Sequence, residues 1–293
     1  MENLSKITKI TKVGVILRPS TPELKDTFYK VKEQFELNNI EVVIDQNSGG
    51  MIDVLGQKFE ILCQTCDLLV SIGGDGTLIS VVRRSYGYNI PVLGVHAGKL
   101  GFLADFDVTK MDETIQSLIT QDYRIDERAM LEAVITSKDG IGNESKMKLI
   151  AFNDVVITRP SISKMIELIT YVDGRSFNTY FGDGLIVSTP TGSTAYNLAA
   201  GGPVLFPLTN VFALTPISPH SLTQRPVVLP GHFSMEIRTP DKSGLLVVDG
   251  QDMYEFCDED TISIKLAKCS AKLIHRKEFN YFDVLKEKLH WGD

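Results

Sequence analysis

One stretch limits the possible folds of this 293-residue chain most strongly: the apolar run at residues 67–72, which ends in Gly73-Gly74-Asp75-Gly76. An apolar run of this length, bounded by glycines, is typical of a buried strand. Beyond the glycines, Leu78, Val81 and Val82 follow Thr77 at helical spacing, so a helix is expected to begin there. The sequence therefore predicts a strand, a glycine loop and a helix in direct succession.

The glycine loop carries one carboxylate, that of Asp75, at the expected helix N-terminus. Backbone N–H groups at such a position hold anions, and a carboxylate there repels a bare phosphate. Asp75 is therefore expected to accept a proton or to bind through a metal ion. The alternative is a tight turn with a capping aspartate, but three glycines within four residues exceed what such a turn needs.

Two familiar glycine loops do not match this stretch. The dinucleotide fingerprint G-x-G-x-x-G fails because Ile79 stands where its last glycine or alanine would be. A Walker A loop requires Gly-Lys followed by Ser or Thr, and that combination does not occur in the sequence.

The glycine loop lies within a longer alternation of expected strands and helices. Strands are predicted at 13–17, 40–44, 67–72 and 91–95. Helices are predicted from Thr21-Pro22-Glu23 to about residue 38, at 57–65, from Thr77 to about residue 85, and at 108–120. This alternation is typical of a parallel sheet covered by helices. Ligands bind such sheets beyond the carboxyl ends of the strands, which is where the glycine loop falls.

After about residue 125 the pattern changes to many short β-rich runs separated by turn signals such as Asp173-Gly174 and Asp249-Gly250. The expected strands are 130–136, 146–158, 167–172, 184–188, 227–229, 233–238, 244–248 and 261–266. This spacing indicates an antiparallel sandwich or layered sheet. We therefore predict an α/β domain at 1–125, a β-rich domain at 126–272 and a C-terminal tail at 273–293. That tail includes a helix at Tyr281–Leu289, which could pack on either domain.

Composition narrows the class of protein. The net charge of −7 argues against a nucleic-acid-binding protein, and no apolar run approaches the ~18 residues of a membrane span. The N-terminus lacks a signal-peptide pattern, so a cytoplasmic location is expected. Cys63 and Cys66 form a C-x-x-C that could be a redox pair or half a zinc site. Since no second half follows, buried small side chains are the favoured interpretation.

Three further groups of residues are candidates for binding. Thr189–Asn197, followed by Ala199–Pro203, combines hydroxyl side chains with small residues after an apolar strand, which favours close approach of a ligand. Asn153-Asp154 is a polar pair inside an apolar run, so it is either a buried network or a ligand contact. Asp183 stands just before the strand at 184–188 and carries little weight by itself.

Together these motifs resemble those of the NAD kinase family. The matching segments are Gly73–Thr77, His96–Leu103, Asn153-Asp154, Asp183–Tyr196 with Ala200–Pro203, and Pro219-His220 with Arg225-Pro226. The glycine loop also occurs in lipid kinases of the diacylglycerol type and in phosphofructokinases, whereas Thr189–Tyr196 is far more specific. The resemblance covers about residues 13–275.

The resemblance implies magnesium-dependent phosphoryl transfer from ATP to the 2′-hydroxyl of the adenosine ribose of NAD, giving NADP. It implies a site between the two domains and a homodimer or homotetramer, with no nucleic-acid or membrane partner. Asp75 would be the general base, and no protein-held metal site is expected. The implied substrate-binding residues are Gly74, Gly76, Asn153, Asp154, Lys164, Asp183, Thr194, Ala195, Tyr196, Asn197, Leu198, Ala199 and Gln251.

Two positions depart from the family pattern. Asp154 replaces the usual glutamate, and Phe181 stands where some relatives carry a basic residue. The alternatives to an NAD kinase are a lipid or sugar kinase that shares the glycine loop and a non-catalytic dinucleotide sensor.

Overall fold

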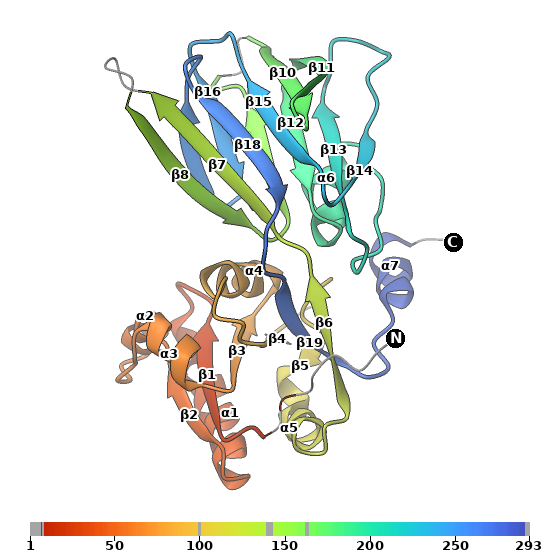
Figure 1. Ribbon diagram of the computed structural model, residues 1–293. Helices are drawn as coiled ribbons and strands as arrows, with labels where there is room; N and C mark the ends of the chain where they lie inside the picture. The colour runs from red at the N-terminus through yellow and green to blue at the C-terminus, as the bar shows by residue number, and fades with distance from the viewer. Residues whose placement is uncertain (1–6, 8, 99–100, 139–142, 162–163, 291–293) are drawn as a thin grey trace. The chain divides into compact units, whose positions relative to one another are not determined.

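The computed structural model describes residues 7, 9–98, 101–138, 143–161 and 164–290. The chain divides into two compact units, residues 1–127 with 271–293, and residues 128–270. Figure 1 colours both units along the chain. The α/β first unit and β-rich second unit confirm the predicted fold class.

The first unit is built on one seven-stranded sheet (Figure 1). Its strands are β1 (Lys12–Leu17), β2 (Glu41–Ile44), β3 (Leu68–Gly73), β4 (Val92–His96), β5 (Phe106–Asp107), β6 (Tyr123–Arg128) and β19 (Ala271–Arg276). Its helices are η1 (Pro22–Leu24), α1 (Lys25–Leu37), α2 (Gln46–Met51), α3 (Phe59–Thr65), α4 (Asp75–Arg84), η2 (Val108–Lys110), α5 (Met111–Ile119) and α7 (Tyr281–Leu289).

The strand order of this sheet is β2-β1-β3-β4-β19-β6, with β5 beside β4, and β1 to β4 pair in parallel. Alternate side chains of β1 serve two faces, as the two-residue period of a strand requires. Val13, Val15 and Leu17 join the core with α1 and α5. On the other face Gly14 leaves room for Leu62 of α3. Because the chain runs outward from β1 in both directions, the carboxyl ends of β1 and β3 form the switch point where ligands bind in such sheets.

The second unit contains two six-stranded antiparallel sheets that share one apolar core. One sheet has the order β11-β10-β15-β18-β7-β8 and the other β14-β13-β12-β9-β16-β17. The strands are β7 (Leu131–Lys138), β8 (Glu144–Ala151), β9 (Asp154–Thr158), β10 (Ile166–Val172), β11 (Arg175–Gly182), β12 (Gly184–Ser188), β13 (Val211–Ile217), β14 (Val227–Pro230), β15 (Ser234–Arg238), β16 (Gly244–Val248), β17 (Asp252–Phe256) and β18 (Thr261–Leu266), with η3 (Thr191–Thr194) and α6 (Tyr196–Ala199) after β12.

The structure differs from the sequence prediction at three places that bear on the site. The run expected at 146–158 is two strands, β8 and β9, which lie in different sheets, so the chain changes sheets at Phe152-Asn153. Helix α4 begins at Asp75 itself rather than at Thr77. Strand β19 pairs with β4 in the first unit, whereas the prediction placed 271–272 in the β-rich domain and started a tail at 273.

Candidate functional site

The carboxylate of Asp75 is held by three consecutive backbone N–H groups. Asp75 is the first residue of α4, directly after the carboxyl end of β3. Phe102 N–H donates to Oδ2 at 2.7 Å, and the N–H groups of Leu103 and Ala104 donate to Oδ1 at 3.2 Å. The segment after β4 is thereby fastened to the first turn of α4.

This arrangement leaves Asp75 with acceptor capacity. An ionised carboxylate offers about four lone-pair positions, and the three N–H donors use two on Oδ1 and one on Oδ2. The residue is half-buried, so Oδ2 can accept one further hydrogen bond, for example from a substrate hydroxyl. A Cβ at Gly101 would collide with this carboxylate, so the clamp requires glycine there.

Gly74 and Gly76 present open backbone. A Cβ at either position would meet no heavy atom within 4 Å, whereas one at Gly73 would collide with the Thr77 hydroxyl. The two glycines predicted to approach phosphates are therefore accessible. Leu100–Leu103 was predicted only as a match to the family. Phe102 and Leu103 hold Asp75, and Leu100 lies outside the described residues.

Asn153 and Asp154 lie where the chain of the second unit passes from one sheet to the other. Asp249, in the turn between β16 and β17, fixes this crossover through its side chain. Its carboxylate accepts N–H bonds from Phe152 at 2.8 Å, Asn153 at 2.7 Å and Asp154 at 2.9 Å. Asp249 was predicted only as part of a turn, because the Asp-Gly turn signal explains it locally.

Two buried polar atoms in this region have no hydrogen-bond partner among the described residues: Asn153 Oδ1 and Thr191 Oγ1. They belong to segments in close contact, because a Cβ at Gly192 would collide with the carbonyl oxygen of Asn153. Native proteins rarely leave such atoms unpaired, so each is expected to have an additional partner. Thr191 lies in the predicted binding stretch Thr189–Asn197 but was not singled out as a contact, because its burial inside a short 3₁₀ turn could not be inferred from sequence.

Asp154 is an unusual carboxyl group. It is 4% exposed, and burial, followed by the nearby charge of Asp249, raises its pKa to about 7. A carboxyl in this state both donates and accepts when protonated and only accepts when ionised. Asn153, Asp154 and Thr191 thus lie on adjoining segments, and Asn153 Oδ1 and Thr191 Oγ1 have unused hydrogen-bonding capacity; these three residues are called the Asn153 cluster.

The residues after β12 divide into exposed and buried groups. Tyr196 is 47% exposed and begins α6, Ala199 is also exposed, and Thr194, Ala195 and Leu198 are half-buried. These residues can contact a ligand at the surface of the second unit.

Asn197 is fully buried, and both ends of its amide are occupied. Nδ2 donates to the carbonyl oxygens of Ser193 and Pro203 at 3.0 Å, while Oδ1 accepts from the Thr215 hydroxyl. Its observed role is to hold the loop that carries Thr194–Tyr196.

Asp183 lies at the other end of β12 from the Asn153 cluster. The pairing of β12 with β9 joins Ser188 to Asp154 at one end and Gly184 to Thr158 at the other. At ~3.3 Å per residue the two ends are about 15 Å apart. The guanidinium of Arg159 lies 2.9 Å from the Asp183 carboxylate, which supplies a positive charge close to the position where Phe181 replaces a basic residue.

The two remaining predicted residues are exposed. Lys164 precedes β10, and Gln251 lies in the turn that carries Asp249.

Among the described residues, no group of three or more His, Cys, Asp or Glu is placed to hold a metal ion. The four cysteines are free, and burial raises the pKa of the Cys63 thiol to about 12, so it stays protonated. No helix among those residues is both long and apolar enough to cross a bilayer.

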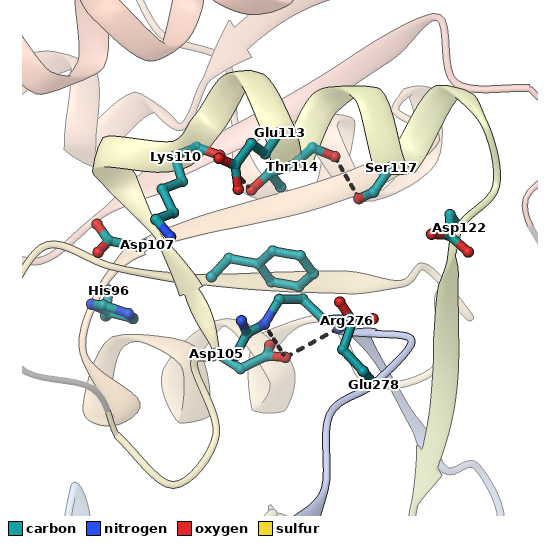
Figure 2. A pocket seen from close by; sticks show the side chains of 11 residues that line it. His96, Asp105, Asp107, Lys110, Glu113, Thr114, Ser117, Asp122, Arg276 and Glu278 are labelled. Carbon is teal, nitrogen blue, oxygen red and sulfur yellow. Dashed lines mark hydrogen bonds and ion pairs between the residues drawn. The ribbon is translucent and has the colours of Figure 1, made fainter.

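The first unit also contains a polar cavity of about 380 Å³ that none of the sequence motifs predicted (Figure 2). Its wall includes His96 and Lys110, with several carboxylates. Figure 2 shows Asp105 bonded to Arg276, and the same carboxylate lies 3.2 Å from the fully buried His275. These contacts join β19 to the segment after β4.

The comparisons with known proteins cover both units. Residues 13–123 match the ATP-NAD kinase N-terminal domain, and residues 152–276 match the ATP-NAD kinase C-terminal domain. The NAD kinase of Sulfurimonas denitrificans is 57% identical over 97% of this chain and 98% of its own, and that of Campylobacter jejuni is 40% identical over the full length of both.

Solved structures show the same likeness. Yeast NADH kinase in complex with NADH has a TM-score of 0.88 at 25% identity, covering 97% of this chain and 89% of its own. An NAD kinase from Archaeoglobus fulgidus in complex with ATP has a TM-score of 0.75 at 22% identity, covering 95% and 98%, and shows a common fold. Family models over both units and relatives along the whole chain lead to one conclusion: the chain belongs to the ATP-NAD kinase family, whose members are kinases that transfer phosphate to NAD.

Proposed function

We propose that this kinase transfers the terminal phosphoryl group of ATP to the 2′-hydroxyl of the adenosine ribose of NAD, forming NADP. The observation that supports this assignment most is the buried cluster of Asn153, Asp154 and Thr191. Two of its polar atoms have no partner among the described residues, which suits an acceptor that carries hydroxyl groups.

Asp75 is the proposed general base. It orients the attacking hydroxyl through the remaining acceptor position on Oδ2 and takes its proton as the bond to phosphorus forms. The N–H groups of residues 102–104 keep the carboxylate in one orientation, which matters because phosphoryl transfer depends mainly on positioning. Gly74 and Gly76 leave space for the phosphates beside the loop.

Further residues of the second unit are proposed to bind the acceptor. Asn153 and Asp154 take ribose hydroxyls, and Thr194–Tyr196 with Leu198 and Ala199 line the adenosine portion. Asp183, about 15 Å away along β12, takes the nicotinamide end. The length of β12 therefore suits an extended dinucleotide. Lys164, Asn197 and Gln251 stay predicted contacts.

Magnesium is proposed to enter with ATP. Mg²⁺ commonly binds through one or two carboxylates and substrate phosphates rather than in a protein cage, so the proposal requires no dedicated protein site. When bound, the ion would neutralise charge on the phosphates. A cytoplasmic location and a homodimer or homotetramer stay predictions.

The test is product identification. Purified protein is incubated with NAD, ATP and magnesium, and the product is separated and compared with 2′- and 3′-phosphorylated standards. We expect the 2′-phosphate alone. A 3′-phosphate, or no NADP from folded protein that binds NAD, would contradict the proposal; binding without turnover would instead favour a dinucleotide sensor.

The same assay sharpens the choice of substrates. NADH is the second acceptor to try, because the solved yeast relative is an NADH kinase. Polyphosphate in place of ATP tests the donor, and a matched reaction with Asp75→Asn measures any phosphorylation that does not depend on this carboxylate.

A further inference from the structure

Asp249 makes an unusually large number of contacts for a turn residue. Besides the three bonds that its carboxylate accepts, its own N–H donates to the carbonyl oxygen of Asp154 at 3.0 Å. Four hydrogen bonds thus join one residue to a segment about 95 positions earlier in the chain. They pair all three N–H groups of the sheet crossover at residues 152–154.

The backbone of Asp249 is adapted to this position. Its φ is 50°, in the left-handed region, and Gly250 follows with a φ of 63°. Non-glycine residues adopt this region rarely, and such strain persists where surrounding contacts require it. Here the strained turn aims the carboxylate at three N–H groups that would otherwise lack partners at the crossover.

The second consequence of Asp249 is electrostatic. Asp154 is buried on β9, which lies between β12 and β16. Its partner on β12 is the uncharged Ser188, and on the β16 side Val248 pairs with the next residue, Val155. Besides burial, the charge of Asp249 is the influence that raises the pKa of Asp154. The Asp249 carboxylate, bonded to the N–H of Asp154 itself, is close enough for its charge to act on the Asp154 side chain, and the ionised form of Asp154 is the costly one.

We propose that Asp249 is a positioning residue for the acceptor: it fixes the backbone of residues 152–154, and its negative charge makes the hold of Asp154 on the ribose hydroxyls depend on pH. This inference rests on the proposed function, because it takes Asp154 as a ribose contact. An ionised carboxylate accepts bonds from two neighbouring hydroxyls more strongly than a neutral acid does. Acceptor binding should therefore strengthen as pH rises through neutrality.

The experiment measures NAD binding by calorimetry at pH 6 and pH 8, without ATP. With Asp154 half-ionised near pH 7, the dissociation constant of the wild-type protein should be about tenfold larger at pH 6 than at pH 8. Asp249→Asn keeps one acceptor oxygen for the crossover but removes the charge, so this ratio should fall to about twofold. Asp154→Asn should bring it to about one.

The matched control is Asp173→Asn. Asp173 lies in another Asp-Gly turn with a φ of 46°, but its carboxylate contacts Ser234, remote from the crossover in the other sheet. This variant should keep the tenfold ratio. Should Asp249→Asn fail to fold, Asp249→Glu and Asp249→Gln form a second pair, of which only the charged member keeps the ratio.

Two results would overturn the proposal. A uniform loss of affinity in Asp249→Asn with the tenfold ratio intact would reduce Asp249 to a structural role, and a pH dependence that persists in Asp154→Asn would move the titration elsewhere. Since binding is measured without turnover, a protein that binds NAD as described yet forms no NADP would refute the proposed function and leave this inference standing.

Discussion

Two carboxylates in this molecule accept three consecutive backbone N–H groups each, and they do different work. Asp75, in the first unit, binds the N–H groups of residues 102–104, and Asp249, in the second, binds those of 152–154. Both carboxylates are half-buried. In the proposed function, the first clamp orients the Asp75 carboxylate itself for chemistry. The second clamp instead orients the segment that carries Asn153 and Asp154, the proposed ligand contacts.

The comparison shows that the same set of hydrogen bonds can position either the carboxylate or the backbone segment that donates to it. A carboxylate that accepts several N–H bonds is fixed in position, and so is the backbone that donates them. We propose that the clamping carboxylate acts on the substrate in the first unit, through Oδ2 of Asp75. In the second unit we propose that the clamped segment does so, through Asn153 Oδ1, a buried atom with no partner among the described residues.

The largest effect is expected from Asp75→Asn. Loss of a general base lowers turnover by about 10²- to 10⁴-fold. The amide also places an NH₂ group opposite one N–H donor of the clamp, so NAD binding and the melting temperature must be measured beside kcat. Turnover within about threefold of wild type would remove Asp75 from the role of base.

Gly101→Ala tests the first clamp without altering the carboxylate. The new methyl group would collide with Asp75, so the carboxylate or the loop must move. Misplacement of this kind can cost up to about 100-fold, and we expect kcat to fall by about 10- to 100-fold while NAD affinity changes little.

The control for this variant is Gly98→Ala, where a Cβ meets no atom within 4 Å. It should leave kcat nearly unchanged. Equal losses in both alanine variants would show that the segment as a whole, rather than the contact with Asp75, is sensitive.

Asp154→Asn tests whether the raised pKa of Asp154, beside the second clamp, makes the stability of the protein depend on pH. The pKa of Asp154 is raised in the folded protein to about 7 from an ordinary value of 3.8, so the folded state binds a proton more readily than the unfolded state between these values. This contribution to stability is fully present below about pH 4 and is lost as pH rises to about 7. Asp154→Asn should remove this part of the pH dependence, which amounts to about 4 kcal/mol.

Chemical unfolding at pH 5 and pH 8 measures the effect. The unfolding free energy of the asparagine variant, relative to that of the wild-type protein, should be higher at pH 8 than at pH 5. A constant difference would mean that Asp154 titrates alike in both states.

Much of this arrangement could be predicted from local sequence. The apolar run before Gly73 and the helical spacing after Thr77 are strong signals, and the strand–loop–helix unit follows them closely. Strand β13 was missed because Pro216 stands near its end, and proline argues against an inner strand. Strand β19 was missed because its pairing with β4 joins residues about 180 positions apart.

The residues of the candidate site were likewise predicted where local sequence marks them and missed where contacts between distant segments define them. Asp75 stands out because it is a carboxylate among three glycines, and Asn153-Asp154 because a polar pair interrupts an apolar run. Asp249 and Thr191 do not, since a turn and a hydroxyl-rich loop explain them locally. Their roles arise from contacts between distant segments, which spacing along the chain does not reveal.

The central claim is that the Asp75 clamp serves chemistry and the Asp249 clamp serves acceptor binding. The most direct measurement determines, for Asp75→Asn and Asp249→Asn side by side, the NAD dissociation constant and the single-turnover rate of NADP formation at saturating NAD. We predict that Asp75→Asn loses at least about 100-fold in rate with NAD affinity within about threefold, and that Asp249→Asn changes NAD affinity and its pH dependence with a rate within about threefold. The reverse pattern, with affinity lost in Asp75→Asn and rate lost in Asp249→Asn, would contradict the account.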